Sequence, residues 1–70
     1  MPTKNYCVDL KGVTAQELYF SELSYWGREE IQHFKDQGYK YWHYKLDYFS
    51  NETEGSQVVT LEQLQELKNA

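Results

Sequence analysis

The sequence predicts a small α+β protein whose three-stranded, mostly antiparallel sheet packs against one long helix and a short C-terminal helix. Three observations predict this class. Residues 39–49 alternate with the period of a strand, residues 15–37 carry a helical apolar stripe, and residues 56–60 are short and β-branched. Their order gives β-α-β-β-α in a single domain spanning residues 1–70.

The aromatic segment 39–49 predicts the central strand. Read with a period of two, one face carries the predicted core side chains Trp42, Tyr44, Leu46 and Tyr48. The opposite face is amphipathic and faces solvent, with Tyr41, His43, Lys45 and Asp47. Aromatic residues are enriched in strands, so composition and alternation agree. We expect the indole of Trp42 to point into the core.

A first strand and a long helix precede this segment. Residues 5–10 alternate apolar and polar side chains, which predicts a short strand. Thr14 and Glu17 have the spacing of a capping box, and Gly38 suits a left-handed helix C-cap. One helix over residues 15–37 is favoured over two, although Gly27 invites a kink. Its predicted core stripe consists of Tyr19, Phe20, Leu23, Trp26, Ile31 and Phe34.

The C-terminal third predicts a hairpin partner and a docked helix. Residues 51–55 form a turn or loop, after which residues 56–60 return to pair with residues 39–49. Thr60 and Gln63 repeat the capping-box spacing and open a helix whose Leu61, Leu64 and Leu67 share a face. The order of the strands stays open, because the first strand can lie parallel to the second or pair with the third.

Size and charge limit the classes of function. A chain of 70 residues buries only about 60% of its unfolded surface, and its single cysteine excludes an intramolecular disulfide. Aromatic side chains, at 17% of residues, or self-association must then supply stability. The net charge of −4 argues against binding to nucleic acid or to an anionic membrane. Without an apolar leader or a spanning segment, we expect a cytoplasmic protein.

No group of residues predicts an enzyme, a cofactor or a metal site. Cys7 lies mid-strand beside Asp9, whose carboxylate raises the pKa of a thiol, so we interpret it as structural. A site built from Cys7, His33 and His43 would require a tertiary coincidence, since no ligand spacing is present. Glu29 and its neighbour Glu30 point about 100° apart on a helix and form no dyad.

The back of the predicted helix offers a candidate contact surface. Leu18 and Tyr25 are seven residues apart and project away from the core stripe, with Gln32 further along the same line. Polar side chains rim them, namely Glu22, Glu29 and Asp36. Such a patch fits a partner protein or a second copy. The alternative is that the C-terminal leucines cover Leu18 and Tyr25.

We therefore predict a non-enzymatic, acidic protein that binds another protein, with self-association as a homodimer. Its contacts would be the helix surface or the strand face with Tyr41 and His43. In size and acidity the chain resembles small phage and mobile-element proteins that block a host or defence enzyme, an analogy without a shared motif. In a DNA-mimic version, carboxylates imitate phosphates, namely those of Glu17, Glu22, Glu29 and Asp36. The alternative is single-stranded nucleic-acid binding on the face of Tyr41, His43 and Lys45.

Overall fold

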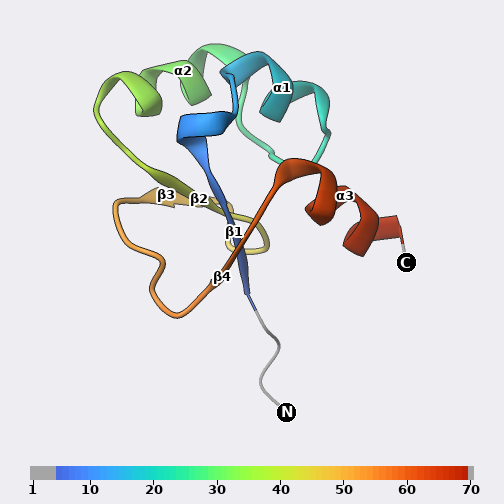
Figure 1. Ribbon diagram of the computed structural model, residues 1–70. Helices are drawn as coiled ribbons and strands as arrows, with labels where there is room; N and C mark the ends of the chain where they lie inside the picture. Colours follow the sequence, from blue (N-terminus) through green and yellow to red (C-terminus); the bar gives the residue numbers. More distant parts are fainter. Residues whose placement is uncertain (1–4, 70) are drawn as a thin grey trace.

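The computed structural model describes residues 5–69, which form one mixed sheet and three α-helices (Figure 1). The strands are β1 (Tyr6–Asp9), β2 (Tyr41–His43), β3 (Tyr48–Ser50) and β4 (Gln57–Val59). The helices are α1 (Ala15–Phe20), α2 (Arg28–Asp36) and α3 (Leu61–Asn69), and a 3₁₀ turn, η1 (Leu10–Gly12), follows β1. The α+β class is confirmed, but the number and pairing of the elements differ from the prediction.

The sheet has four strands in the order β3-β2-β1-β4, rather than three. β2 is antiparallel to both β1 and β3, whereas β4 is parallel to β1. The prediction that residues 56–60 pair with the central strand was therefore wrong. That place is taken by β3, which folds back onto β2, so β4 crosses to the far side of β1.

The predicted central strand, residues 39–49, is a hairpin instead. A four-residue loop, 44–47, separates β2 from β3, and the Asp47 amide donates to the Tyr44 carbonyl at 3.2 Å. Asp47 takes a left-handed φ of 48°, a conformation that aspartate tolerates better than most residues. Leu46, predicted to lie in the core, is 61% exposed in this loop. The turn was not predicted because the aromatic alternation continues on both sides of it.

The predicted long helix is two helices joined by residues 21–27, which we call the α1–α2 connection. Serine side chains break the helix by bonding to the backbone. The Ser21 hydroxyl donates to the Leu18 carbonyl at 2.6 Å and accepts from the Leu23 amide. Glu22 then takes a left-handed φ of 59°, and the Trp26 amide donates to Ser24 Oγ. Gly27 thus precedes α2 and does not lie inside a helix.

The helix ends follow the predicted local chemistry. Both capping boxes form: the Glu17 amide donates to Thr14 Oγ1 at 3.1 Å, and the Gln63 amide donates to Thr60 Oγ1 at 3.1 Å. The reciprocal bonds reach back to the Thr14 and Thr60 amides. Gly38 follows α2 with a φ of 96°, as a left-handed C-cap requires. These bonds satisfy amides that a helix cannot pair internally.

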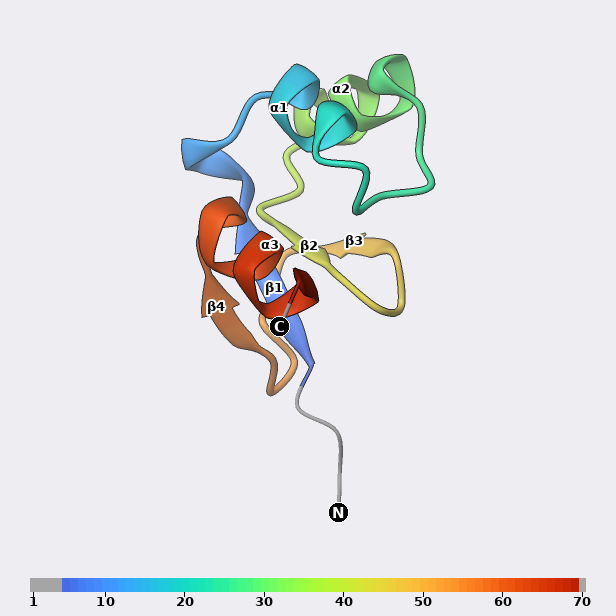
Figure 2. The ribbon, with the colours of Figure 1, turned by 90° about the vertical axis from the view of Figure 1, so that its right-hand side faces the viewer.

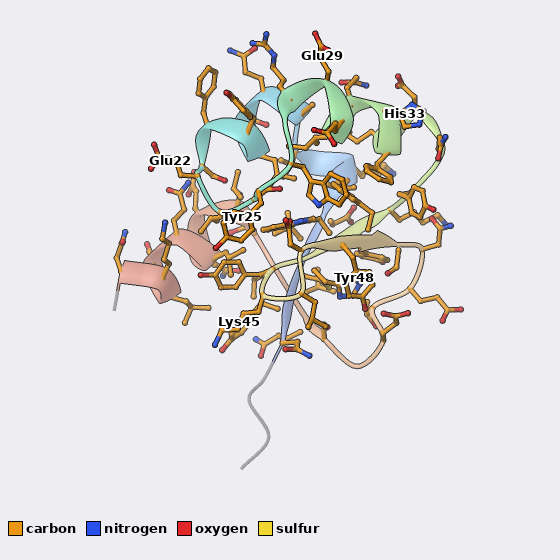
Figure 3. The ribbon with its side chains drawn as sticks, turned by 180° about the vertical axis from the view of Figure 1, so that it is seen from behind. Glu22, Tyr25, Glu29, His33, Lys45 and Tyr48 are labelled. Atoms are coloured by element: carbon orange, nitrogen blue, oxygen red, sulfur yellow. The ribbon has the colours of Figure 1, made fainter. Side chains whose placement is uncertain are left out.

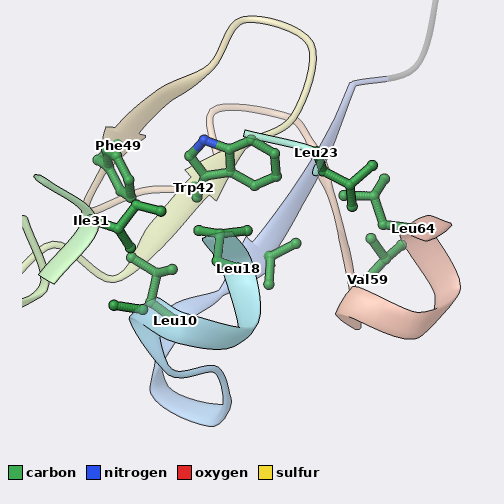
Figure 4. Packing of buried hydrophobic residues seen from close by; sticks show 10 residues of the cluster. Leu10, Leu18, Leu23, Ile31, Trp42, Phe49, Val59 and Leu64 are labelled. Atoms are coloured by element: carbon green, nitrogen blue, oxygen red, sulfur yellow. The ribbon is translucent and has the colours of Figure 1, made fainter. Parts of the chain in front are cut away.

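One core joins the sheet to all three helices. Register places Val8, Trp42, Phe49 and Val59 on one face of the sheet, and α1, α2 and α3 cover it with Leu18, Ile31 and Leu64 (Figure 4). Figures 1 and 2 show α1 and α2 together at one end of the sheet, with α3 beside β1. Trp42 is fully buried, as predicted.

Aromatic side chains supply much of the packing. Phe34 stacks on Phe49 with ring centroids 4.5 Å apart, and Trp26 meets Phe34 edge-on at 5.1 Å. Such pairs contribute about 0.5–1.5 kcal/mol each beyond the area they bury. The predicted core stripe was wrong at Tyr19 and Phe20, which are exposed, because the break after Phe20 ends the helix on which it was drawn.

Candidate protein-binding surface

Asp47 joins the β2–β3 loop to the α1–α2 connection. Its Oδ1 accepts from the Trp42 indole N–H at 2.7 Å and from the Ser24 hydroxyl at 3.2 Å. Its Oδ2 accepts from the Tyr25 amide at 3.2 Å. The Asp47 carbonyl accepts from the Trp26 indole N–H at 3.1 Å. We call these five residues the Asp47 cluster.

The Asp47 cluster makes two surface loops into one rigid unit. Three of its four bonds end on a carboxylate, and hydrogen bonds to a charged group are about twice as strong as neutral ones. One partner, Trp42, is fully buried, so its indole N–H has to find an acceptor inside the protein. The cluster therefore fixes the backbone on both sides of Tyr25.

The side chain of Tyr25 itself projects into solvent. It is 94% exposed, although its own amide and the side chain of the next residue, Trp26, are both bonded to Asp47. Figure 3 shows Tyr25 above Lys45 of the neighbouring loop, and both line one hollow. This small hollow, of about 220 Å³, is lined by Glu22, Leu23, Tyr25, Tyr44, Lys45 and Lys68.

Further large apolar side chains are exposed on the adjoining segments. Phe20, the last residue of α1, is 61% exposed and meets the half-exposed Tyr19 edge-on at 5.3 Å. Leu46 directly precedes Asp47 and is also exposed. Tyr25 and the residues that line the hollow beside it are hereafter the Tyr25 surface. Exposed apolar groups of this kind with a charged rim are typical of protein contact sites.

The predicted contact surface on the back of the helix was wrong for Leu18. Its other two central residues, Tyr25 and Gln32, lie on separate elements. Leu18 is fully buried in the core, because the break at Ser21 rotates α1 away from the register of a continuous helix. The alternative, that the C-terminal leucines cover both residues, is wrong for Tyr25, which is exposed, whereas Leu18 lies in the same core cluster as Leu64. Gln32 lies on α2 and donates to Asp36 Oδ1 at 2.8 Å. Figure 3 shows Glu29 on the outer side of α2, away from Tyr25.

The carboxylates of the DNA-mimic prediction do not follow one straight helix. Glu17 is engaged in the α1 capping box, through a 2.8 Å bond from the Thr14 amide. Glu22 lies in the α1–α2 connection, and Glu29 and Asp36 lie on α2. All four are exposed, but they are distributed over separate elements.

The predicted strand face was wrong for His43, which is buried at 1% exposure. Its Nε2 lies 2.6 Å from Ser50 Oγ, and its Nδ1 lies 3.2 Å from Ser56 Oγ. The Tyr48 ring stacks on the imidazole at 4.4 Å. The loop after β3 therefore closes over His43, and Lys45 lies in a turn rather than beside it. Tyr41 is only partly exposed, so this face is not an open stacking platform.

Cys7 is a buried free thiol whose register partner on β2 is His43. Burial first, and the negative charge of Asp9 second, raise the pKa of this thiol. The direction is the one predicted from the sequence, and it disfavours the thiolate that nucleophilic chemistry requires.

The described residues form neither a metal-binding cluster nor a membrane-spanning helix. Residues 5–69 contain no group of three or more histidine, cysteine, aspartate or glutamate side chains placed to hold a metal ion. In the same part of the chain, no helix is long and apolar enough to cross a bilayer.

Comparisons with protein-family models, with curated proteins and with solved structures found no match to this chain. Sequence reasoning missed the role of Asp47 in the candidate site. The available signal was the aspartate that ends the polar-to-apolar alternation before Tyr48, since aspartate is favoured in turns.

Proposed function

We propose that this chain is a non-enzymatic protein that binds another protein through the Tyr25 surface. The observation that carries the proposal is the contrast within Tyr25 between a backbone bonded to Asp47 and a side chain 94% exposed. Tyrosine is among the residues enriched at the energetic centres of protein interfaces. A residue whose backbone is already ordered adds affinity at a lower entropic cost than one on a mobile loop.

The surroundings of Tyr25 fit an interface rather than a small-molecule pocket. The adjoining hollow, at about 220 Å³, is smaller than most ligand pockets and carries charges of both signs, from Glu22, Lys45 and Lys68. A polar rim around exposed aromatic and aliphatic anchors is the usual composition of a protein contact. The same rim favours orientation of a partner over tight enclosure of a ligand.

The partner is another protein or a second copy of this chain. An inhibitor of a host or defence enzyme is the more specific version, and it is supported by small size and a net charge of −4. A DNA mimic is the weaker version, because its carboxylates are spread over α1, α2 and their connection. The exposed acids Glu29 and Asp36 on α2 would supply most of that charge.

Affinity capture with a matched pair of baits tests the proposal. Tagged wild-type protein and Tyr25→Asp are incubated with lysate of the source cells, and captured proteins are purified and titrated by calorimetry. We expect a partner that binds wild type and loses at least about tenfold in affinity with Tyr25→Asp, as for a typical hot-spot residue. Sedimentation of both forms tests the second copy as partner in the same way.

Two outcomes would reject this function. One is a purified partner, or a dimer, that tolerates Tyr25→Asp without loss. The other is a monomer that captures no protein but binds a single-stranded oligonucleotide with steep salt dependence, the behaviour of a nucleic-acid module.

A further inference from the structure

The outer edge of β4 is a second feature of the molecule, apart from the Tyr25 surface. β4 is the last strand of the sheet, next to β1 (Figure 2). The Gln57 amide donates to the Asn5 carbonyl at 2.9 Å, so Gln57 and, two residues on, Val59 direct their backbone groups toward β1. The amide and carbonyl of Val58, between them, therefore point outward from the sheet.

Within the described residues, two of the devices that usually prevent strand pairing are absent from this edge. Edge strands are commonly protected by charged side chains, proline or a covering element. Residues 56–60 contain neither a charge nor a proline, and the Val58 side chain is 47% exposed. The backbone groups of Val58 are thus available to an added strand.

Two hollows beside β4 have apolar side chains and carboxylates in their linings. The larger, of about 610 Å³, lies between β4 and the start of α1, with Val13 and Leu61 in its lining. The smaller lies between β4 and α3 and reaches the half-exposed Leu67. Both are lined by carboxylates and, within residues 5–69, neither is lined by lysine or arginine. These carboxylates are Asp9, Glu17, Glu62 and Glu66.

We propose that the β4 edge binds an extended segment of a partner protein in which lysine or arginine alternates with apolar residues. Such a segment would pair its backbone with the amide and carbonyl of Val58, as in strand addition to a sheet edge. Its side chains alternate in direction, so the basic residues on the α3 side reach Glu62 and Glu66, with their apolar stems over the hollow floors, and the apolar residues lie beside Val58 on the opposite face. The complementary charge selects this occupant.

A second copy of this chain fits the edge less well. A two-fold pairing of β4 with β4 would bring the four carboxylates of one copy close to the same four of the other, and each chain carries a net charge of −4. Like charges brought together at an interface oppose association. The proposal concerns a different surface from the Tyr25 surface and does not depend on it.

The test titrates ¹⁵N-labelled protein with a synthetic heptapeptide of alternating lysine and valine, followed by NMR. We expect the largest shift changes at the Val58 amide and at residues of α3. Val58→Pro removes the outward amide while leaving the bonds of Gln57 and Val59 to β1, and proline is tolerated at such edge positions. It should weaken peptide binding about tenfold, the value of roughly one to two hydrogen bonds. Val58→Thr keeps the amide and should bind as wild type does.

Changes in the peptide keep the test valid if Val58→Pro fails to fold. A peptide with its central residues N-methylated cannot pair with Val58, and a glutamate–valine peptide carries the wrong charge. Both should bind at least about tenfold more weakly than the lysine–valine peptide. Tyr25→Asp should leave its binding unchanged, which separates this proposal from the proposed function.

Three results would overturn the proposal. These are equal binding of the N-methylated and unmodified peptides, shift changes that avoid β4, and a β4-paired homodimer that Val58→Pro dissociates. The last would assign the edge to a second copy.

Discussion

Replacing Asp47 with glycine tests the hydrogen-bond cluster that joins the two loops around Tyr25. The substitution removes the carboxylate that accepts from the Trp42 indole, the Ser24 hydroxyl and the Tyr25 amide. It leaves the Asp47 carbonyl, and hence its bond from Trp26, in the backbone. Glycine also accepts the left-handed φ of 48° without strain.

The expected loss follows from what each donor does afterwards. The Trp42 indole N–H is buried and would lack its acceptor, which costs about 1–3 kcal/mol. Ser24 and the Tyr25 amide lie nearer the surface, where water recovers part of their two bonds, leaving about 1 kcal/mol. Glycine relieves the strain of the left-handed backbone, which stabilises the fold by about 1 kcal/mol. It also raises the entropy of the unfolded chain, which destabilises the fold by about 1 kcal/mol, so the two effects nearly cancel. We therefore expect a loss of about 3 kcal/mol in the free energy of unfolding.

Urea unfolding followed by tryptophan fluorescence measures this loss, and Glu22→Gly is the matched control. Glu22 has a similar left-handed φ of 59° and an exposed side chain. Its replacement changes the same backbone terms without removing the Asp47 carboxylate, so the free energy should stay within about 0.5 kcal/mol of wild type. Equal stability of Asp47→Gly and Glu22→Gly would refute the assigned role of the carboxylate.

Three further predictions concern the core, a helix cap and the buried thiol. Leu18→Ala should lose about 3 kcal/mol in urea unfolding because it opens a core cavity, whereas Tyr25→Ala should lose less than about 0.5; the reverse order would restore Leu18 to the surface. Thr14→Ala should cost about 1 kcal/mol and selectively increase hydrogen exchange in α1. Because the folded pKa of Cys7 is raised, the unfolded chain loses that proton first. Stability should thus be retained below about pH 8.5 and fall above it, more steeply in wild type than in Cys7→Ala; parallel pH profiles would contradict the shift.

Local sequence chemistry predicted the helix starts and the main core anchor. Thr14 and Thr60 cap helices because each needs only a partner three residues away, which is visible in the sequence. Trp42 is buried because alternation marks one face of its strand. These features depend on a few neighbouring residues, so tertiary structure did not alter them.

The turn at residues 44–47 and the break at residues 21–27 were not predicted, because both depend on competing interactions. Alternation continues across the turn, and only the contacts of Asp47 with Ser24 and Tyr25, more than twenty residues away, show why the chain reverses there. Ser21 is compatible with a helix until its hydroxyl bonds the backbone.

The unpredicted turn and the unpredicted helix break also explain which residues of the candidate site were predicted correctly. Tyr25 was predicted to be a contact residue from helical spacing, although it belongs to no helix. Tyr25 is nevertheless exposed, as predicted, because Trp26 and not Tyr25 is the aromatic residue of the α1–α2 connection that packs against the core. Leu18 and His43, in contrast, became core residues once the helix ended early and the strand turned back.

Hydrogen exchange at the Tyr25 amide tests the central claim most directly. An exposed loop amide without a partner exchanges at the rate of an unfolded peptide, whereas one bonded to the Asp47 carboxylate exchanges only when the cluster opens. We predict that exchange at Tyr25 is slowed at least about a hundredfold in wild type and becomes fast in Asp47→Gly. Unprotected exchange in the wild-type protein would mean that Tyr25 is displayed on a mobile loop.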